Sequence, residues 1–217
     1  METKLDGERI QCHMQDGVVK FFTRNSNNYT RIYGPKISQY IKDNVDAQAC
    51  ILDGEMVVWD NEKKQIAPFG LNQKVATRDS NDDQDGTSHL QICYMIFDIL
   101  YIKAHGEDSE EINLMGARLQ DRKIVLSRVV KEVPNVLEIV RGKECLTVEE
   151  VFEEFNQSIY RNEEGIMIKR MDSPYKPAER SSTWIKLKGE YIDSIGDTLD
   201  LVIIGGYFGE RKRIGGG

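Results

Sequence analysis

The sequence predicts an α+β fold made mostly of antiparallel sheets with flanking helices. Short apolar runs typical of strands recur from residue 8 to residue 207, far apart along the chain. Two of these runs flank Asp16-Gly17, a dipeptide typical of the tight turn in an antiparallel hairpin. Helical spacing is confined to three stretches, so strands outnumber helices.

The first strands are expected over residues 8–14 and 18–24, on either side of the Asp16-Gly17 turn. Gly34-Pro35 then opens a helix. The apolar residues that follow recur at helical spacing: Ile37, Tyr40, Ile41 and Val45.

Two long apolar strands are expected next, over residues 49–59 and 90–102. The first is interrupted by Asp53-Gly54-Glu55. The second is nearly continuous, as in a buried central strand, and Asp98 is the charged exception in it. Between them, residues 79–88 form a polar loop.

The second half of the chain predicts helices over residues 118–131 and 148–161. Thr147 is a suitable N-cap for the latter, and Glu149-Glu150 lie in its first turn, where negative charge favours the helix dipole. The remaining strands are expected over residues 136–140, 166–169, 184–188 and 199–207.

Composition excludes several classes of protein. The 217 residues are 40% apolar with 18 glycines, which is the composition of a globular chain and not of a disordered or collagen-like one. No apolar run approaches the ~18 residues of a membrane span, so no membrane partner is expected. The four cysteines form no CxxC pair, which is typical of a reducing compartment and gives no zinc-site spacing. The net charge of −7 means that a polyanion must meet a local basic face, or be held by chain outside this sequence.

Six short polar motifs interrupt or end the expected elements. A KxDG pattern alone would arise by chance roughly 0.05 times in a chain of this length. The functional interpretation therefore depends on all six motifs occurring together. In the last motif, strand alternation places Lys186 and Lys188 on one face. In order, the motifs are Lys4 to Arg9 (KLDGER), Arg24-Asn25, Asp53-Gly54-Glu55, Phe97-Asp98, Glu164 to Lys169 (EGIMIK) and Trp184 to Lys188 (WIKLK).

These motifs, in this order over residues 2–188, resemble those of the covalent nucleotidyltransferases, which include ATP-dependent DNA ligases, RNA ligases and capping enzymes. Segments such as ETKLDGER, CILDGEM and LDLVIIGGYFG are most similar to the eukaryotic DNA ligase IV subfamily. GDTLDLV and the WDNEKKQI turn are also similar to the replicative DNA ligases.

The resemblance implies an ATP-grasp-like adenylation domain over residues 1–198. Residues 199–217 would then be the truncated start of an OB-fold domain, with residues 199–207 as its first strand. The chain is accordingly expected to be a piece of a longer protein, able to adenylate itself weakly and to seal DNA poorly or not at all.

The implied chemistry centres on Lys4, whose amine attacks the α-phosphate of ATP. An amine attacks only when it is deprotonated, and nearby cations favour that neutral form. Lys169, Lys186 and Lys188 are expected to line the same pocket and to neutralise the triphosphate. Each of these lysines, taken alone, would be interpreted as a solvated surface residue.

The resemblance also implies a purine pocket. Phe97 would stack on one face of adenine and Met167 would pack on the other, although both types are more often plain core residues. Glu2 would read the exocyclic amine, with further contacts from Thr3 and Leu5 beside the nucleophile. Arg9 and Arg24 would hold the ribose or phosphates, and Arg24 is equally a candidate for binding a 5′ phosphate of DNA.

Glu55 and Glu164 are the expected magnesium-side carboxylates, because magnesium prefers hard oxygen ligands. Glu55 is also a candidate for contacting the ribose, and the sequence does not separate the two roles. Asp6 and Asp53 are interpreted as turn or supporting residues.

The expected function is therefore that of a nuclear ATP-dependent DNA ligase core that forms lysyl-AMP and transfers AMP to the 5′ phosphate of a DNA break, in double-strand break repair by non-homologous end joining. A replicative-type ligase, an RNA ligase or capping-type enzyme, and a non-catalytic module are the alternatives. The coiled-coil scaffold expected as a partner of the full-length protein would grip a C-terminal region outside this chain.

Overall fold

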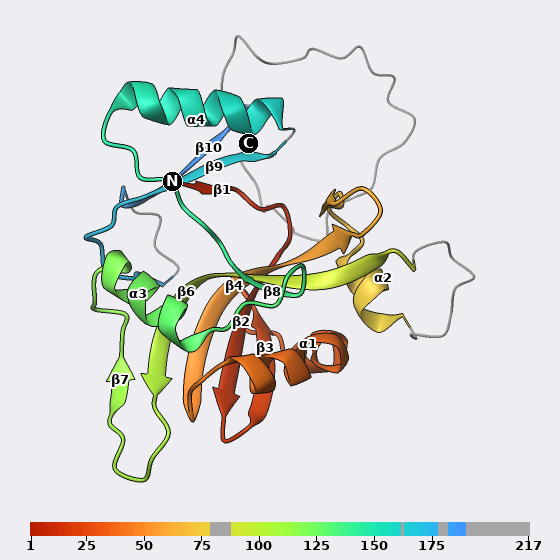
Figure 1. Cartoon of the computed structure of the whole chain (residues 1–217), viewed down its shortest axis with the longest axis vertical. Helices are drawn as coiled ribbons and strands as arrows, with labels where there is room; N and C mark the ends of the chain where they lie inside the picture. The colour runs from red at the N-terminus through yellow and green to blue at the C-terminus, as the bar shows by residue number, and fades with distance from the viewer. Residues whose placement is uncertain (79–87, 162, 178–181, 190–217) are drawn as a thin grey trace, which may run out of the picture.

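Two sheets, one of three strands and one of seven, organise the chain (Figure 1). The computed structural model describes residues 1–78, 88–161, 163–177 and 182–189. All strand pairings in both sheets are antiparallel except one, which confirms the expected α+β class. The expected strand over residues 199–207, the boundary at residue 198 and most of the loop over residues 79–88 lie outside the described residues.

The large sheet has the strand order β3-β2-β4-β6-β7, with β5 paired to β4 and β8 paired in parallel to β6. Asp16 and Gly17 have φ angles of 48° and 75°, which suit the tight turn of the β2–β3 hairpin. The strands are β2 (Glu8–Gln15), β3 (Val18–Thr23), β4 (Ala49–Asp60), β5 (Gln65–Ile66), β6 (Leu90–Lys103), β7 (Glu111–Asn113) and β8 (Leu137–Ile139).

Strand β4 is not broken at its polar motif. It runs continuously through Asp53-Gly54-Glu55, and the register with β6 shifts there instead. A Cβ at Gly54 would lie 2.6 Å from the ring of Tyr94 and 2.7 Å from the carbonyl oxygen of Met95, so glycine lets the two strands pass closely. The motif thus lies in the middle of the sheet and not in a turn.

The small sheet has the order β1-β9-β10 and joins the start of the chain to its second half. The strands are β1 (Glu2–Thr3), β9 (Gly165–Lys169) and β10 (Trp184–Lys188). Gly165 begins β9 with a φ of 138°, and a Cβ there would lie 2.1 Å from the carbonyl oxygen of Leu187. Only glycine fits this position without displacing β10.

The helices are α1 (Thr30–Asn44), α2 (Asn72–Thr77), α3 (Leu119–Val129) and α4 (Val148–Tyr160). Figure 1 shows α4 on the side of the small sheet that faces away from the large sheet, and α1 beside β3. As expected, Thr147 caps α4, in a capping box with Glu150. No helix among the described residues is both long and apolar enough to cross a bilayer.

Helix α1 begins before the expected position. Gly34 and Pro35 lie inside the helix, which starts at Thr30, so their interpretation as the opening residues is wrong. Tyr33 extends the buried stripe of Ile37 and Ile41 by one turn, and this packing outweighs the backbone hydrogen bond that a proline cannot donate.

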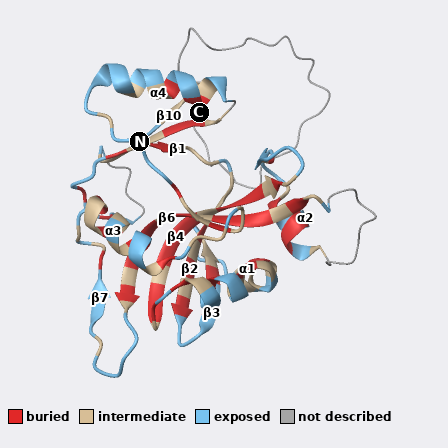
Figure 2. Cartoon of the chain, viewed as in Figure 1, coloured by how far each residue is buried: buried red, intermediate tan, exposed pale blue. Residues whose placement is uncertain are grey.

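The buried cluster is centred on the long strands β2, β4 and β6 and is covered by α1 (Figure 2). Outside this apolar cluster, Asp98 of β6 and Arg122 of α3 form an ion pair in which both side chains are completely buried. Two hydrogen bonds of 2.7 and 2.8 Å join the guanidinium to the carboxylate. Arg122 also donates to the carbonyl oxygens of Ala117 and Ser173, so it ties α3, β6 and the chain after β9 together.

We expect Arg122→Met to lower the free energy of unfolding by about 3–5 kcal/mol, because it leaves the Asp98 carboxylate buried without its cation. Arg118→Met is the matched control on the same helix region, where an exposed pair with Asp121 should contribute only about 0–1 kcal/mol. Urea denaturation of both variants measures the difference. Similar small losses for the two would contradict the structural role of the buried pair.

Candidate functional site

One face of the small sheet carries most of the side chains singled out in the sequence. Residues directly opposite each other on paired strands share a face, and alternate residues along a strand do so as well. Glu2 lies opposite Met167, which lies opposite Lys186. By this register, the shared face contains Glu2, Lys4, Met167, Lys169, Trp184, Lys186 and Lys188.

At one end of this face, Lys4 and Lys188 share the carboxylate of Glu164. Lys4 Nζ pairs with Glu164 Oε2, and Lys188 Nζ lies 2.6 Å from Glu164 Oε1. Burial would raise the pKa of Glu164, but the hydrogen bonds from Lys188 and Lys4 outweigh it and lower that pKa. The backbone N–H of Lys4 also donates to the carbonyl oxygen of Gly165 over 2.8 Å. The expected neighbour Lys188 is thus joined to Lys4 through Glu164.

At the other end, Lys169 pairs with Glu2 and not with the groups around Lys4. Its Nζ donates to Glu2 Oε2 and lies 4.5 Å from the ring centroid of Phe97 and 4.2 Å from that of Trp184. Burial lowers the pKa of Lys169, an effect that Glu2 opposes. Lys169 therefore lies beside Glu2 and the aromatic rings, at the other end of the face from Lys4, and its expected role toward the triphosphate stays a prediction.

The large sheet contributes Arg9, which faces the same space. Arg9 donates to both oxygens of the buried Asp53, over 3.1 and 2.6 Å. It donates as well to the hydroxyl of Tyr175 over 2.6 Å, and its guanidinium lies 5.9 Å from the Phe97 ring centroid. Burial alone would lower the pKa of Arg9, but the Asp53 carboxylate raises it. Asp53 is thus a supporting residue that holds the arginine, as the sequence suggested.

Glu55 lies opposite Arg9 on the neighbouring strand β4. Burial raises its pKa to about 7, while the charges of Lys4, Arg9 and Arg24 act in the opposite direction. These interactions place Glu55 within the electrostatic reach of all three cations. Arg24 itself is exposed beyond the end of β3.

The expected residues are not all brought together. The Thr3 hydroxyl donates to Glu163 over 3.4 Å on the opposite face of the small sheet, so a nucleotide would meet only its backbone. Leu5 is half-buried beyond the end of β1, and Lys186 is on the correct face but exposed. Met167 lies half-buried at the centre of the face, between Glu2 and Lys186.

Glu55 and Glu164 fit a magnesium ion in their chemistry. Both interact with Lys4, and carboxylate oxygens are the hard ligands that this ion takes. Within the described ranges, no three His, Cys, Asp or Glu side chains cluster as a complete metal site. One or two carboxylates completed by substrate phosphates and water are the usual set for magnesium.

Three residues of the site were missed in the sequence. Tyr175 donates to Asp53 over 2.8 Å, and Trp184 contacts the rings of both Phe97 and Tyr175. Trp184 opens the WIKLK motif, and its position two residues before Lys186 could have revealed it. Lys123, which lies 2.6 Å from Glu2, stands in an ordinary helical sequence that gives no such signal.

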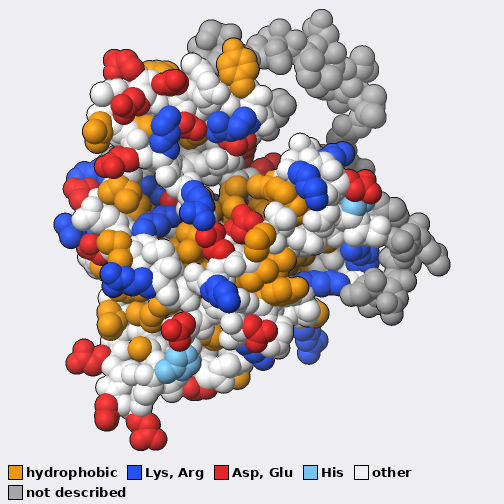
Figure 3. Space-filling model, viewed as in Figure 1, with side chains coloured by type: hydrophobic (Ala, Val, Ile, Leu, Met, Phe, Trp, Pro, Cys, Tyr) orange, Lys and Arg blue, Asp and Glu red, His pale blue; other side chains and the backbone are white. Residues whose placement is uncertain are grey.

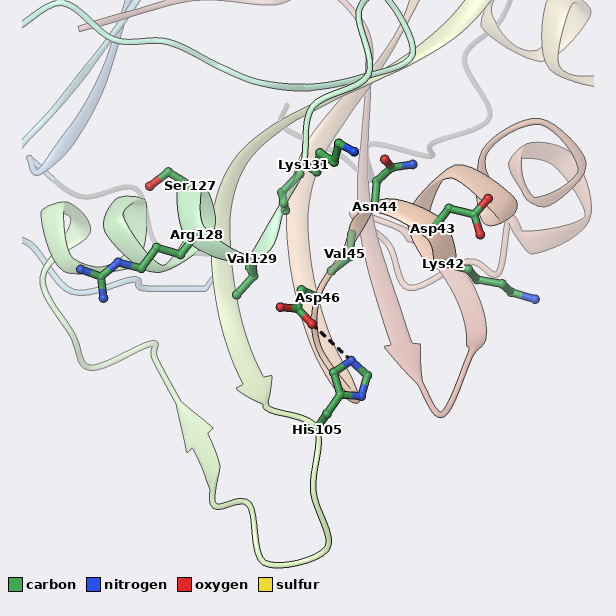
Figure 4. A pocket seen from close by; sticks show the side chains of 11 residues that line it. Lys42, Asp43, Asn44, Val45, Asp46, His105, Ser127, Arg128, Val129 and Lys131 are labelled. Atoms are coloured by element: carbon green, nitrogen blue, oxygen red, sulfur yellow. Dashed lines mark ion pairs between the residues drawn. The ribbon is translucent and has the colours of Figure 1, made fainter.

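A separate pocket of about 460 Å³ lies where α1 and α3 end, away from the residues described above (Figure 4). Its side chains include an ion pair between Asp46 and His105, 3.5 Å apart, and mixed charges such as Lys42, Asp43 and Arg128. None of the site residues expected from the sequence lines it.

Comparisons with known proteins agree on one family. A family model described as "ATP dependent DNA ligase domain" matches residues 1–188. DNA ligase 4 of Dictyostelium discoideum is 38% identical over 225 residues, which cover 100% of this chain and 20% of that protein. Human DNA ligase 4 is 36% identical over 99% of this chain and 23% of that protein. The chain therefore spans about a fifth of the length of these curated relatives.

Solved structures share the fold. The ligase domain of Mycobacterium tuberculosis LigD has a TM-score of 0.62 at 24% identity, over 87% of this chain and 54% of that one. The ATP-dependent DNA ligase of bacteriophage T7, in complex with ATP, has a TM-score of 0.52 at 17% identity, over 87% of this chain and 61% of that one.

The raised pKa of Glu55 predicts a pH-dependent stability. The pKa of Glu55 is about 7 in the folded chain and 4.5 for an ordinary glutamate. Between these two pH values, the folded chain therefore holds a proton on Glu55 that the unfolded chain has lost. The free energy of unfolding of the wild type should therefore fall as the pH rises from about 5 to 8. Compared with Glu55→Gln, the fall should be larger by an amount on the order of 1–3 kcal/mol. Urea denaturation across this range measures it, with the exposed Glu107→Gln as the baseline for removing a carboxylate. Parallel curves for wild type and Glu55→Gln would contradict the assignment.

Proposed function

The chain belongs to the ATP-dependent DNA ligase domain family, and we propose that it is the adenylating core of a ligase of the DNA ligase 4 kind. The observation that supports this most directly is the convergence of Lys4, Glu164 and Lys188 at one end of the small sheet. The first step of ligation needs an amine, positive charge for a triphosphate and oxygen ligands for a metal. All three lie at this end of the sheet.

In the proposed reaction, the neutral amine of Lys4 attacks the α-phosphate of ATP. A nitrogen–phosphorus bond forms as the bond from the α-phosphorus to the bridging oxygen breaks, and pyrophosphate leaves with that electron pair. The nitrogen becomes positively charged as the bond forms and gives up one proton to water, which leaves the lysyl-AMP phosphoramidate. Because Lys4 is paired with Glu164 in this structure, its ammonium group must first lose a proton, to the carboxylate or to water, before the lone pair of the amine can attack.

The remaining cations would position the phosphates. Lys188 and Lys186 share the face of Lys4, and Arg9 and Arg24 act on Glu55 from the large sheet. A magnesium ion held by Glu164 and Glu55 would supply charge neutralisation for the leaving pyrophosphate. Binding of the ion to Glu164 would also withdraw the carboxylate from Lys4. Nucleotidyl transfer needs such positioning and neutralisation more than covalent help.

The adenine would occupy the end of the face near Glu2. Phe97 offers an aromatic surface, and Met167 lies on the same face as Glu2. The carboxylate of Glu2 can accept a hydrogen bond from the amino group of adenine, since a carboxylate has about four acceptor positions and two are taken by lysines. The oxo group of guanine has no hydrogen to donate there.

The later steps are proposed for the longer protein. AMP would pass to the 5′ phosphate of a DNA break, and the adjacent 3′ hydroxyl would displace it. Basic and acidic side chains are interspersed on the face drawn in Figure 3, in keeping with the net charge of −7. DNA would therefore be gripped mainly by other parts of that protein. The 36–38% sequence identity to proteins named DNA ligase 4 supports a nuclear role in end joining. A scaffold partner would bind outside this chain.

Lys4→Ala should abolish covalent labelling of the chain by radiolabelled ATP and magnesium, because the attacking amine is gone. Lys20→Ala, which removes an exposed lysine on β3, is the matched control and should label like wild type. The label should be lost in acid, as expected of a phosphoramidate. Equal labelling of wild type and Lys4→Ala would end the assignment, and stronger labelling by GTP than by ATP would favour a capping-type enzyme.

Glu164→Gln should raise the magnesium concentration for half-maximal labelling by roughly tenfold, because an amide is a weaker ligand for this ion. Glu163→Gln alters the neighbouring glutamate, which contacts Thr3 and Arg161 on the opposite face, and should leave that concentration unchanged. A magnesium titration at saturating ATP separates the two variants. Identical titration curves would show that Glu164 does not serve the metal.

A further inference from the structure

The carboxylate of Glu2 is buried between two lysines that come from different parts of the fold. Only 7% of Glu2 is exposed. Lys169 Nζ donates to Oε2, and Lys123 Nζ lies 2.6 Å from Oε1. Lys169 belongs to the same small sheet as Glu2, whereas Lys123 belongs to α3, which packs on β6 of the large sheet.

Lys123 is held in place for this contact. Its Nζ also donates to the carbonyl oxygen of Val140 over 3.3 Å, and its side chain is 19% exposed. The chain that leaves Val140 then passes beside β1, where Gly142 forms a bridge with Glu2. Lys123 thus fixes both the carboxylate of Glu2 and the segment that borders its backbone.

Helix geometry explains why α3 can serve both sheets. Consecutive residues on a helix point about 100° apart. Arg122 turns toward Asp98 on the large sheet, and Lys123 turns toward Glu2 on the small sheet. The two carboxylates are therefore placed relative to each other by adjacent residues of one helix.

The second lysine changes the state of the carboxylate. Burial alone would raise the pKa of Glu2, but the charges and hydrogen bonds of Lys169 and Lys123 lower it. An ionised carboxylate can only accept hydrogen bonds, whereas a protonated one can also donate. The ionised carboxylate of Glu2 therefore favours the amino group of adenine over the oxo group of guanine.

We propose that Lys123 is a positioning residue that orients the Glu2 carboxylate and thereby sets the preference of the site for adenine over guanine. This inference rests on the proposed function, because it takes Glu2 to be the group that reads the base. Lys123 itself touches no substrate. It acts through Glu2, and Lys169 alone holds only one of the two carboxylate oxygens.

The test uses the 217-residue chain with Lys123→Met, which keeps most of the unbranched side chain and removes its charge. Calorimetric titration gives the Kd of ATP and of GTP, and covalent labelling gives KM and the maximal rate. We expect ATP binding to weaken roughly tenfold and the preference over GTP to fall by a similar factor, the loss of about one charged hydrogen bond. The maximal labelling rate should stay within about twofold.

Two further variants separate positioning from folding. Lys123→Arg restores a cation and should recover most of the affinity and selectivity, while Arg128→Met removes an exposed cation of the same helix and should change neither. If Lys123→Met does not fold, Lys123→Gln, which keeps a donor without the charge, takes its place in the same titrations.

The proposal is overturned if a folded Lys123 variant binds ATP like wild type, or if it loses ATP and GTP affinity equally. Either result leaves the proposed function intact as long as Lys4 is labelled and Lys4→Ala is not. Labelling that persists in Lys4→Ala would instead reject the proposed function.

Discussion

The pairing of two residues at the start of the chain with β9 is the constraint on which the site depends. It sets Glu2 opposite Met167 and brings Lys4 to Glu164. Because side chains alternate along a strand, a slip of one residue would turn Glu2 and Lys4 toward α4, away from the large sheet. Gly165 protects the register, since no other residue fits its φ of 138° so close to β10. A two-residue strand thus determines whether Lys4 meets Glu164 and Lys188.

Buried ion pairs hold the elements of the site together, and the pair between Glu2 and Lys123 links the small sheet to the helix that packs on the large one. Three buried carboxylates receive their cations from other elements: Asp98 of β6 from α3, Asp53 of β4 from β2, and Glu2 of β1 from both β9 and α3. An isolated buried charge is strongly unfavourable, so neither sheet can present its polar face without the elements that neutralise it. The charges therefore make the relative placement of the sheets specific, which apolar packing alone does less well. This matching also explains why polar motifs interrupt strands that are otherwise apolar.

The sequence predicted what depends on local pattern. The β2–β3 hairpin, the long strands β4 and β6, the capping box of α4 and the shared face of Lys186 and Lys188 all follow from neighbouring residues. It did not predict β1, β5, α2 or β7, each of which has six or fewer residues and no clear periodicity. The start of α1 was misplaced because tertiary packing of Tyr33 overrides the local signal of a proline. Lys123 and Tyr175 are partners of residues more than 100 positions away, and such contacts leave no local trace.

The charge of the site differs from that of the chain around it. The chain carries a net charge of −7, yet cations outnumber carboxylates among the side chains that face or support the site. The cations are Lys4, Arg9, Arg24, Lys123, Lys169, Lys186 and Lys188, and the carboxylates are Glu2, Asp53, Glu55 and Glu164. A local surplus of positive charge between sheets is unfavourable by itself and is relieved by an anionic ligand. The net negative charge of the chain would repel a polyanion, so a small triphosphate bound at these cations would gain more from the surplus than a long nucleic acid. The charge pattern therefore favours a small triphosphate over a long nucleic acid as the ligand of this face.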